Sequence, residues 1–511
     1  MASPSKAVGR TQAREPTYLE ALIPLILLSA LVGGSVALFG LDAMSGPLQA
    51  GMMLAAMAAS LIIMRLGHSW DEVAEAGRRG VSSVVSAIFI LLAVGALIGT
   101  WNMAGTIPTL VYYGLLLMQP HWFYPASLVL CALVSIGIGS SWTTVGTIGV
   151  GLMGLATFTG VSPVITAGAI VSGAYTGDKL SPLSETTILA AQLTGNDLYK
   201  HLRYQAWVSI PAFLIAAAVL LVLGLSNTNV ASDAIIDSEL MALDRIFWIT
   251  PINLLPLVLL IGMSMRRMPA SLALMTSAIF AAVLGCLTQP QAVLSVLPTD
   301  GVTGGLGSFI KASWQVIANG FHSESGIQQV DDLLSRGGMA SMLLTIWLII
   351  AALAFGSILD EFGFLSKLIA PVLLRAKQTG NLIATAVLTP IGLNIITADQ
   401  YVAMVLPTRL FGEEFKKRGL ASKNLSRAVS NGGIVTAPLV PWNSCGAYMS
   451  AVLGVPTFAY LPFAVFNYMS PLLDVTYGYT GFKIATADGK PDGDASDAQE
   501  PVAARLDLTR P

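Results

Sequence analysis

Three carboxylates stand in parts of the chain where charged residues are otherwise rare. Asp178 and Glu185 belong to the sequence GAYTGDKLSPLSETT, and residues 81–177 before them contain no Asp, Glu, Lys or Arg. Asp399, in GLNIITADQ, is the one charged residue between positions 378 and 408. A carboxylate removed from water binds either a proton or a hard cation such as Na⁺ through its oxygen atoms. Competition for one carboxylate can couple the two ions in opposite directions, so we interpret these residues as ion- and proton-binding.

Oxygen donors and one ammonium group surround the three acids. Hard cations take hydroxyl, amide and carbonyl oxygens as ligands, and the ammonium of Lys179 can neutralise Asp178 in the empty site. We expect these residues to support the site: Lys179, Ser140, Ser141, Thr143, Thr144, Ser181, Ser184, Thr186, Asn394, Thr397, Asn443 and Ser444.

Most of these groups also have a structural interpretation. Asp178 and Lys179 can form an ion pair at a helix break, Glu185 can cap a helix after Ser184, and the hydroxyls of SSWTT can satisfy the backbone of a turn. Asp399 is alone in its segment, so a structural role explains it least well. Other residues are not expected to be ligands. Trp142 and Trp442 are expected to pack or to lie at the membrane interface, and His121, His201 and His322 to face water in loops.

The composition places these residues in an all-α polytopic membrane protein. Of the 511 residues, 54% are hydrophobic and 11% are charged, whereas soluble domains carry about 25% charged residues. Uncharged apolar runs of ~18 residues or more indicate membrane spans, and we expect about 10 crossings. The apolar segments are 19–40, 48–66, 81–118, 122–159, 163–195, 205–225, 246–265, 270–288, 339–374, 381–411, 427–454 and 457–474.

The sequence argues against several other classes of protein. It has no basic stripe for nucleic acid, no P-loop and no HExxH zinc motif. Cys131, Cys286 and Cys445 lack metal or disulfide spacing. We therefore expect no enzyme and no cofactor, only transported ions.

Basic residues assign each loop to one side of the membrane. By this assignment, two of the apolar segments do not cross the membrane. Segment 381–411 has Lys or Arg residues on both flanks, and segment 122–159 has none on either. Each segment therefore has both ends on one side of the membrane, the first on the cytoplasmic side and the second on the external side. We interpret them as re-entrant hairpins, whose irregular tips need surrounding protein or a wet cavity.

The hairpins belong to a predicted repeat. Gly80 matches Gly338 and Gly105 matches Gly363, and LSPL at 180–183 matches TAPL at 436–439. The first copy starts on the cytoplasmic side and the second on the external side, which predicts an inverted-topology repeat. By the offset of 256 residues that relates LSPL to TAPL, Thr143 is the counterpart of Asp399.

A broken helix completes each copy of the repeat. Gly177, Ser181, Pro182 and Ser184 are expected to interrupt the first, and Gly432, Gly433, Pro438 and Pro441 the second. Such breaks present helix ends and free carbonyl oxygens to an ion. The predicted organisation is a cytoplasmic N-terminal segment 1–18, N-terminal spans 19–66, a first repeat 67–225, connecting spans 226–320, a second repeat 321–480 and a disordered tail 481–511.

Long motifs in the chain resemble the NhaC family of Na⁺/H⁺ antiporters. They are GSSWTTVGTIGVGLMG, ITAGAIVSGAYTGDKLSPLSETT, VTAPLVPWNSCGAYMSAVLGVP and ITADQYVAMVLP. The resemblance implies exchange of Na⁺ for H⁺ across a bacterial inner membrane, a hairpin-containing fold and a homodimer, as is frequent in the superfamily. This chain departs from the family's usual SPLSDTTNLAP, because Glu185, Ile188 and Ala191 replace Asp, Asn and Pro.

Three hypotheses follow for the activity. The first is Na⁺/H⁺ antiport by alternating access, with Na⁺, H⁺ and the lipid bilayer as partners, cytoplasmic termini and no nucleic acid. The second is Na⁺-coupled transport or exchange of a small organic acid or amino acid, with Lys179 and the hairpin hydroxyls holding the carboxylate. The third, from another class, is an intramembrane hydrolase with Asp178 and Asp399 as an acid pair, although the repeat gives it no support.

Overall fold

The structure is a computed structural model that describes residues 13–117, 119–226, 240–241, 243–297, 305–324, 326, 330–331 and 334–487. Most of the predicted N-terminal segment, most of the loop 226–244 and the tail from residue 488 onward lie outside the described residues. Residues 481–487, which we predicted to begin the tail, are placed: Thr486 forms a β-bridge with Leu420.

The described residues are almost entirely helical, as the sequence predicts. Among them, eight helices are long and apolar enough to cross a membrane. The all-α polytopic class is therefore confirmed.

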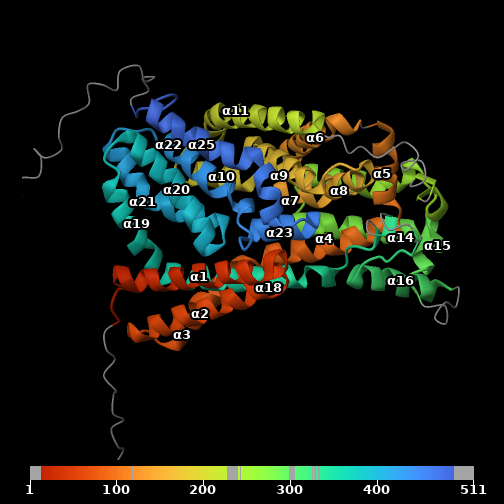
Figure 1. Cartoon of the computed structure of the whole chain (residues 1–511), viewed down its shortest axis with the longest axis horizontal. Helices are drawn as coiled ribbons and strands as arrows, with labels where there is room; N and C mark the ends of the chain where they lie inside the picture. Colours follow the sequence, from red (N-terminus) through yellow and green to blue (C-terminus); the bar gives the residue numbers. More distant parts are fainter. Residues whose placement is uncertain are drawn as a thin grey trace, which may run out of the picture.

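One group of helices packs together in the lower part of Figure 1. In it, α3 lies against α18, α2 packs on both α1 and α18, and α4 contacts α14 and α16. The group comprises α1 (Tyr18–Phe39), α2 (Pro47–Arg65), α3 (Trp70–Ser83), α4 (Val85–Met103), α14 (Ala270–Thr288), α15 (Pro290–Leu294), α16 (Leu306–Asn319) and α18 (Leu343–Glu361).

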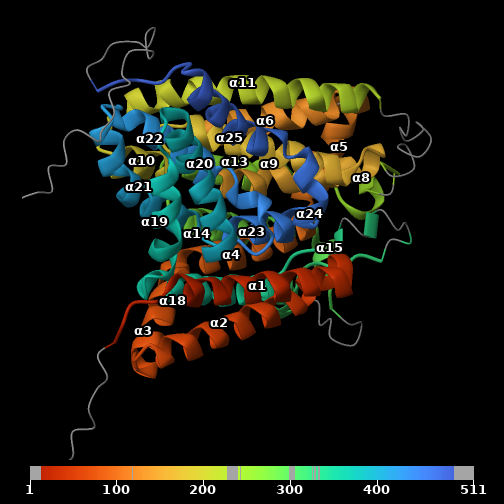
Figure 2. The same cartoon turned by 60° about the vertical axis from the view of Figure 1, so that its left-hand side comes forward.

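A second group, which holds the predicted site, lies above the first in Figures 1 and 2. Its most extensive contact joins α6 to α9, and α25 packs on α11 and α20. The group comprises α6 (Phe123–Ile138), α7 (Ser141–Thr144), α8 (Val150–Thr159), α9 (Pro163–Leu180), α10 (Glu185–Leu193), α11 (Leu198–Leu225), α20 (Thr379–Thr397), α21 (Gln400–Lys417), α22 (Ser422–Val429), α23 (Ser444–Leu453), α24 (Thr457–Tyr460) and α25 (Val465–Thr480).

Three further helices connect the two groups. Helix α5 (Thr106–Leu117) contacts α4 and α8, α13 (Leu255–Met265) contacts α14 and α6, and α19 (Phe364–Arg375) contacts α18 and α20. The span predicted at 246–265 is shorter than expected, because α13 starts only after a 3₁₀ turn at Pro251–Leu254.

Each predicted hairpin is a pair of helices that meet at the predicted tip. In the first, α6 ends at Gly139, whose φ of 77° is left-handed, and Ser140 caps α7. In the second, α20 ends at Ala398, whose φ is 56°, and Asp399 caps α21. Figure 1 places α20 and α21 at the left end of the molecule and α8 towards its right end, with α7, α10 and α23 between them.

Both predicted helix breaks are present. Residues Ser181–Ser184 separate α9 from α10, and Ser184 caps α10 through the N–H of Thr187 at 3.2 Å. In the second copy, α22 continues into a π-helical turn, Ser430–Ile434, and regular helix resumes only at Ser444.

Gly177 does not interrupt its helix, contrary to our prediction. It lies inside α9 at the contact with α6, where an added Cβ would lie 2.3 Å from the carbonyl oxygen of Ala132. This glycine permits close helix packing, which is a frequent role of small residues in membrane helices.

Replacing Gly177 with Val is therefore expected to destabilise the protein by about 1–3 kcal/mol, because overpacking forces α6 and α9 apart. The melting temperature in detergent measures the effect. Gly137→Ala on α6 is the matched control, since a Cβ there meets no atom within 4 Å. Equal melting temperatures for wild type and Gly177→Val would contradict the packing argument.

Candidate functional site

The carboxylate of Asp178 joins the first helix break to the first hairpin tip. Its Oδ2 accepts hydrogen bonds from the hydroxyl of Ser141 at 2.7 Å and from the backbone N–H of Ser141 at 3.3 Å. Asp178 is 6% exposed. The structure thus brings together two of the predicted site residues.

Other hydroxyls of the first copy bond to a neighbouring hydroxyl or to backbone carbonyls. Thr143 donates to the hydroxyl of Ser140 at 3.0 Å, and Thr144 donates to the carbonyl of Ser140 at 2.9 Å. Ser181 donates to the carbonyl of Ile136 at 2.8 Å. These contacts agree with the structural interpretation of SSWTT, although a donating hydroxyl keeps lone pairs that can face a cation.

Asp399 forms the start of α21. Its Oδ1 accepts the N–H groups of Tyr401 at 2.6 Å and Val402 at 3.0 Å, and the residue is 8% exposed. Both bonds fall on one oxygen, and no hydrogen bond from another described residue reaches Oδ2. Asp399 therefore has a clear capping role and an oxygen that remains available to a ligand.

Glu185 connects the two halves of the chain. It occupies the first position of α10 after the cap Ser184, is exposed, and accepts a hydrogen bond from the hydroxyl of Tyr401 on α21. The cap Ser184 also contacts the hydroxyl of Thr186 at 3.0 Å. Tyr401 was not predicted as a site residue, although it stands two positions after Asp399.

Amides, not free carbonyls, dominate the second break. The side-chain N–H₂ of Asn394 donates to the carbonyl of Gly433 at 2.6 Å and to the hydroxyl of Thr436 at 3.1 Å. Asn443 donates to the Asn394 side-chain oxygen at 3.1 Å and caps α23. Our expectation of free carbonyls is therefore only partly met, since Asn394 satisfies that of Gly433.

The remaining two candidates of the second copy also sit at the tip. Thr397 donates to the carbonyl of Leu393 at 2.9 Å, so its hydroxyl serves α20. The backbone N–H of Ser444 donates to the carbonyl of Ala398 at 3.0 Å and attaches α23 to the tip.

Both predicted tryptophans pack, as expected. Trp142 stacks on Tyr448 of α23, with ring centroids 4.1 Å apart, and its carbonyl accepts the Tyr448 hydroxyl at 2.8 Å. Trp442 is partly buried and donates to the carbonyl of Ile395 at 2.7 Å. The tip of the first hairpin thus contacts the second broken helix through Trp142 and Tyr448. In the same way, Tyr401 of the second hairpin contacts the first broken helix at Glu185.

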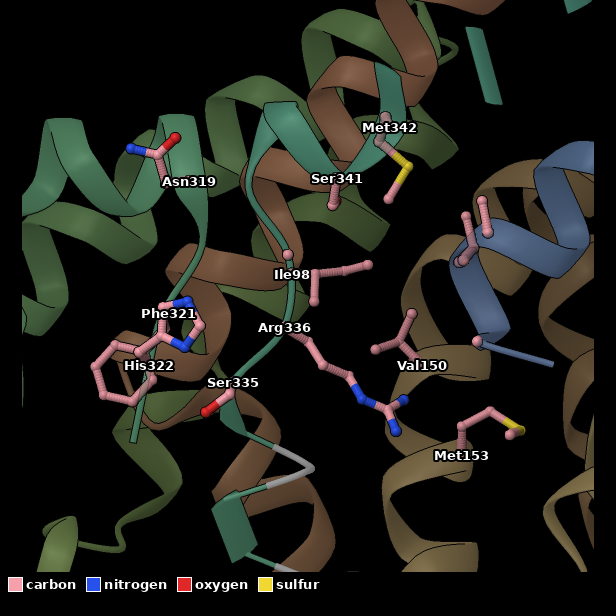
Figure 3. Close-up of a pocket in the computed structure, with 14 residues that line it drawn as sticks. Ile98, Val150, Met153, Asn319, Phe321, His322, Ser335, Arg336, Ser341 and Met342 are labelled. Atoms are coloured by element: carbon pink, nitrogen blue, oxygen red, sulfur yellow. The ribbon is translucent and has the colours of Figure 1, made fainter. Parts of the chain in front are cut away.

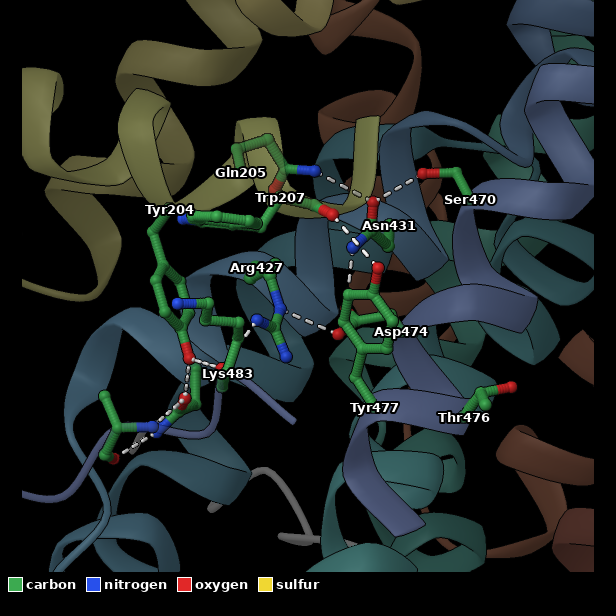
Figure 4. A network of polar contacts seen from close by, with 12 residues as sticks. Tyr204, Gln205, Trp207, Arg427, Asn431, Ser470, Asp474, Thr476, Tyr477 and Lys483 are labelled. Atoms are coloured by element: carbon green, nitrogen blue, oxygen red, sulfur yellow. Dashed lines mark hydrogen bonds and ion pairs between the residues drawn. The ribbon is translucent and has the colours of Figure 1, made fainter. Parts of the chain in front are cut away.

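Lys179 does not neutralise Asp178. Its ammonium donates to the side-chain oxygen of Asn431, and no ion pair between it and Asp178 occurs among the described residues. Gln205 at 3.0 Å and Ser470 at 2.8 Å donate to the same oxygen (Figure 4). Lys179 is 1% exposed, and its ammonium points to the π-helical turn that holds Asn431, beside α11 and α25, and not to the carboxylate of Asp178.

Figure 4 shows a buried ion pair next to Asn431 that the sequence analysis missed. Arg427 Nε lies 2.7 Å from Asp474 Oδ1, and the side chains are 1% and 0% exposed. Asn431 donates to the other oxygen of Asp474 at 2.6 Å. The available signal was an acid inside the apolar sequence FNYMSPLLDVTYGY, which we took as the end of a span.

His201 is not in a solvated loop, contrary to our prediction. Helix α11 starts at Leu198, so His201 lies in its first turns at 1% exposure, with Nδ1 2.6 Å from the hydroxyl of Ser426. His121 and His322 are exposed, as predicted.

Arg427→Met is expected to lower the free energy of unfolding by about 3–5 kcal/mol, because it leaves the Asp474 carboxylate buried without its cation. The double variant Arg427→Met, Asp474→Leu should recover part of this loss. Arg79→Met is the control, since its ion pair with Glu361 is exposed and is worth at most about 1 kcal/mol. Melting temperatures in detergent measure all three, and a single variant as stable as wild type would contradict the argument.

The apolar helices and the polar groups at their breaks define a multi-pass helical membrane protein. Comparison with known sequences then identifies its family: residues 17–192 and 173–482 match the sequence profile of the Na⁺/H⁺ antiporter family. The chain belongs to this family, as its resemblance to the NhaC proteins predicts.

Relatives of the chain differ in the solutes that their names give. The Na⁺/H⁺ antiporter NhaC of Alkalihalophilus pseudofirmus is 37% identical over 82% of this chain and 87% of the relative. The malate-2H⁺/Na⁺-lactate antiporter of Bacillus subtilis is 33% identical over 92% and 96%. The arginine/ornithine antiporter ArcD of Halobacterium salinarum is 33% identical over 93% and 94%. These relatives are transporters, and each is named as an antiporter.

Proposed function

We propose that the protein exchanges Na⁺ for H⁺ across the bacterial inner membrane, with Asp178, Glu185 and Asp399 as the ion- and proton-binding residues. The observation that carries the proposal is the contact of Tyr401 with Glu185. It connects the helix that Asp399 caps to the helix that follows Asp178, so acids from both halves border one region at the helix breaks.

Exchange of Na⁺ for H⁺ then follows from the competition of the two ions for one carboxylate. A Na⁺ ion at Asp178 takes carboxylate oxygen, and the lone pairs of nearby hydroxyls such as Ser141 complete its shell. A proton on the same carboxylate removes its charge and therefore excludes Na⁺. Alternating exposure of this region to the two sides of the membrane converts competition into exchange.

An inverted repeat with two re-entrant hairpins supplies the alternating exposure in this proposal. Both copies have the same order of elements: a long helix, a short helix, a helix pair and a broken helix. Gly105 and Gly363, matched in the sequence, both have left-handed φ values, of 74° and 76°, between the long and the short helix. The other matched pair differs, because Gly80 lies inside α3 while Gly338 is in a loop.

The second candidate function is Na⁺-coupled movement of an organic acid or amino acid, as the names of two relatives suggest. The replacement of the family's usual Asp and Asn by Glu185 and Ile188 favours a changed solute. Lys179 gives this candidate no support as a carboxylate ligand, because its ammonium is held by Asn431. An intramembrane hydrolase also lacks support, since Asp178 and Asp399 bond to different groups.

Everted membrane vesicles test the proposal. After an imposed acid-inside pH gradient, Na⁺ added as the chloride salt should dissipate the gradient without any organic solute. Vesicles lacking the protein, and choline chloride in place of NaCl, are the controls. Proton movement only when an organic acid or amino acid is also present would instead establish the second candidate.

A further inference from the structure

Tyr175 carries a buried hydroxyl group one helical turn before Asp178. The two residues are three positions apart on α9, so their side chains lie on the same face of that helix. Tyr175 is 1% exposed, and its hydroxyl has no hydrogen-bond partner among the described residues. A buried hydroxyl without a partner is unfavourable, so a ligand that satisfies it gains free energy.

The thiol of Cys445, on α23, is the polar neighbour of this hydroxyl from the second half of the chain. Asp178 and Cys445 both act electrostatically on the Tyr175 hydroxyl. Cys445 also interacts with the indole of Trp142 on α7. Because a thiol is a weak hydrogen-bond partner, it can orient the Tyr175 O–H and leave the lone pairs of the oxygen to another ligand.

Cys445 lies in the first turn of α23, which is attached to the tip that holds Asp399. The N–H of the preceding residue, Ser444, donates to the carbonyl of Ala398 at 3.0 Å. Asp399 in turn acts electrostatically on Cys445. The Tyr175 hydroxyl therefore lies on the connection between the acids of the two halves.

The charges of this region favour a cation as the ligand. Among the described residues, neither Asp178 nor Asp399 forms an ion pair, and Asn431 holds the ammonium of Lys179. An anion would therefore meet two carboxylates without a counter-charge. The phenol oxygen is a hard donor of the kind that Na⁺ takes, whereas the indole N–H of Trp142 can only donate.

Stacked aromatic rings lie between this hydroxyl and a cavity at the far end of α23. The cavity, of about 480 Å³, is shown in Figure 3, and Val452 belongs to its lining, but Tyr175, Trp142 and Cys445 do not. Along α23, Tyr448 is one turn from Val452 and one turn from Cys445, and its ring stacks on that of Trp142. A ligand of Tyr175 is therefore held in a dry region, as suits an ion that has lost its water.

We propose that the Tyr175 hydroxyl is a further ligand of the transported Na⁺, which it shares with the carboxylate of Asp178. This inference rests on the proposed Na⁺ site at Asp178 and adds one oxygen to it. In the occupied site, the O–H of Tyr175 turns to the sulfur of Cys445 and its oxygen to the ion. Loss of the hydroxyl should then weaken Na⁺ binding without weakening the fold.

Isothermal titration calorimetry with Na⁺ on the purified full chain in detergent tests this role. NaCl replaces choline chloride at constant ionic strength and pH. Tyr175→Phe should raise the Kd for Na⁺ at least about tenfold, because a contact to a charged ligand is lost. Its melting temperature without Na⁺ should equal or exceed that of wild type, because an unpartnered buried hydroxyl is removed. The ratio of Na⁺ to Li⁺ affinity should also change, since the number of ligands contributes to ion selectivity.

Tyr448→Phe is the matched control, because it removes a hydroxyl that has a partner in the protein. The Tyr448 hydroxyl donates to the carbonyl of Trp142 at 2.8 Å. This variant should melt at a lower temperature than wild type. It should keep both the wild-type Kd for Na⁺ and the wild-type ratio of Na⁺ to Li⁺ affinity.

Three results would overturn the inference. Wild-type Na⁺ affinity in Tyr175→Phe would leave the hydroxyl to water or to packing. Equal loss of Na⁺ and Li⁺ affinity, with a lower melting temperature, would assign the hydroxyl to the fold. No saturable Na⁺ binding to wild type would remove the ion itself.

The calorimetric measurement is distinct from the test of Na⁺/H⁺ exchange, because it is made at equilibrium and without a proton gradient. If vesicles show no Na⁺-driven proton movement but Tyr175→Phe binds Na⁺ more weakly than wild type, the exchange proposal fails and the ligand role of Tyr175 stands. If vesicles exchange Na⁺ for H⁺ and Tyr175→Phe binds Na⁺ as wild type does, only the ligand role fails.

Discussion

Replacing Asp178 with Asn is expected to remove Na⁺-driven proton movement while leaving the protein folded. The amide has nearly the same shape, and its oxygen can still accept the hydroxyl of Ser141, now 2.7 Å from the carboxylate. It cannot be protonated, and it attracts Na⁺ weakly. Loss of one partner from a buried charged contact costs about 2 to 5 kcal/mol, which is about 30-fold or more in affinity.

Proteoliposomes with a pH-sensitive dye inside measure this effect as the initial rate over a range of Na⁺ concentrations. Ser141→Ala should be intermediate, because it loses one donor to Asp178 and keeps the charge; a loss of about tenfold in apparent Na⁺ affinity is expected. Glu361→Gln, at the exposed end of α18, is the control for removing an acid elsewhere. Wild-type exchange by Asp178→Asn would exclude this carboxylate from ion binding.

The helix breaks and hairpin tips were predictable because their signals are local. Pro182 removes a backbone donor and disfavours a helix interior, Ser184 is a preferred N-cap type, and the break at Ser181–Ser184 lies there. The side-chain direction of Lys179 was predictable too, although we did not use it. Consecutive residues on a helix do not face each other, so Asp178 and Lys179 could not both point at the break while inside α9.

Other features depend on contacts that no local signal encodes. Arg427 and Asp474 meet across 47 positions of sequence, and each stood at the edge of a predicted span. Gly177 has the composition of a helix breaker, but its place against Ala132 is a property of the packed pair. His201 was misplaced through a missed local cue, because Asp197 caps α11 through the N–H of Lys200 and moves the helix start ahead of the prediction.

The hydrogen bonds between polar groups at the hairpin tips were predictable in part: the residue types were predicted, but their partners were not. The residue types around the second break, Asn394 and Asn443, were predicted as part of the site. Their amides bond mainly to each other and to the backbone of the break. A single sequence cannot distinguish an amide that binds an ion from one that supports the loop, because both uses call for the same oxygen and the same buried position.

Asp399 can likewise act as a helix cap, as an ion ligand, or as both, and three substitutions distinguish these roles. As a cap, Asp399 accepts the N–H groups of Tyr401 and Val402, and Asn or Ser can replace Asp in this role, whereas Ala costs about 0.5–2 kcal/mol. As an ion ligand, Asp399 needs its negative charge, which Asn, Ser and Ala all lack.

We expect Asp399→Asn and Asp399→Ser to melt near the wild-type temperature and to exchange Na⁺ for H⁺ at least about 30-fold more weakly, by the same free-energy argument as for Asp178. Asp399→Ala should lose both stability and exchange. Full exchange by the Asn and Ser variants, with impairment of Ala alone, would show that Asp399 only caps α21. The acids of the first half, Asp178 and Glu185, would then have to bind the ions alone, with the second half holding them in place through Tyr401.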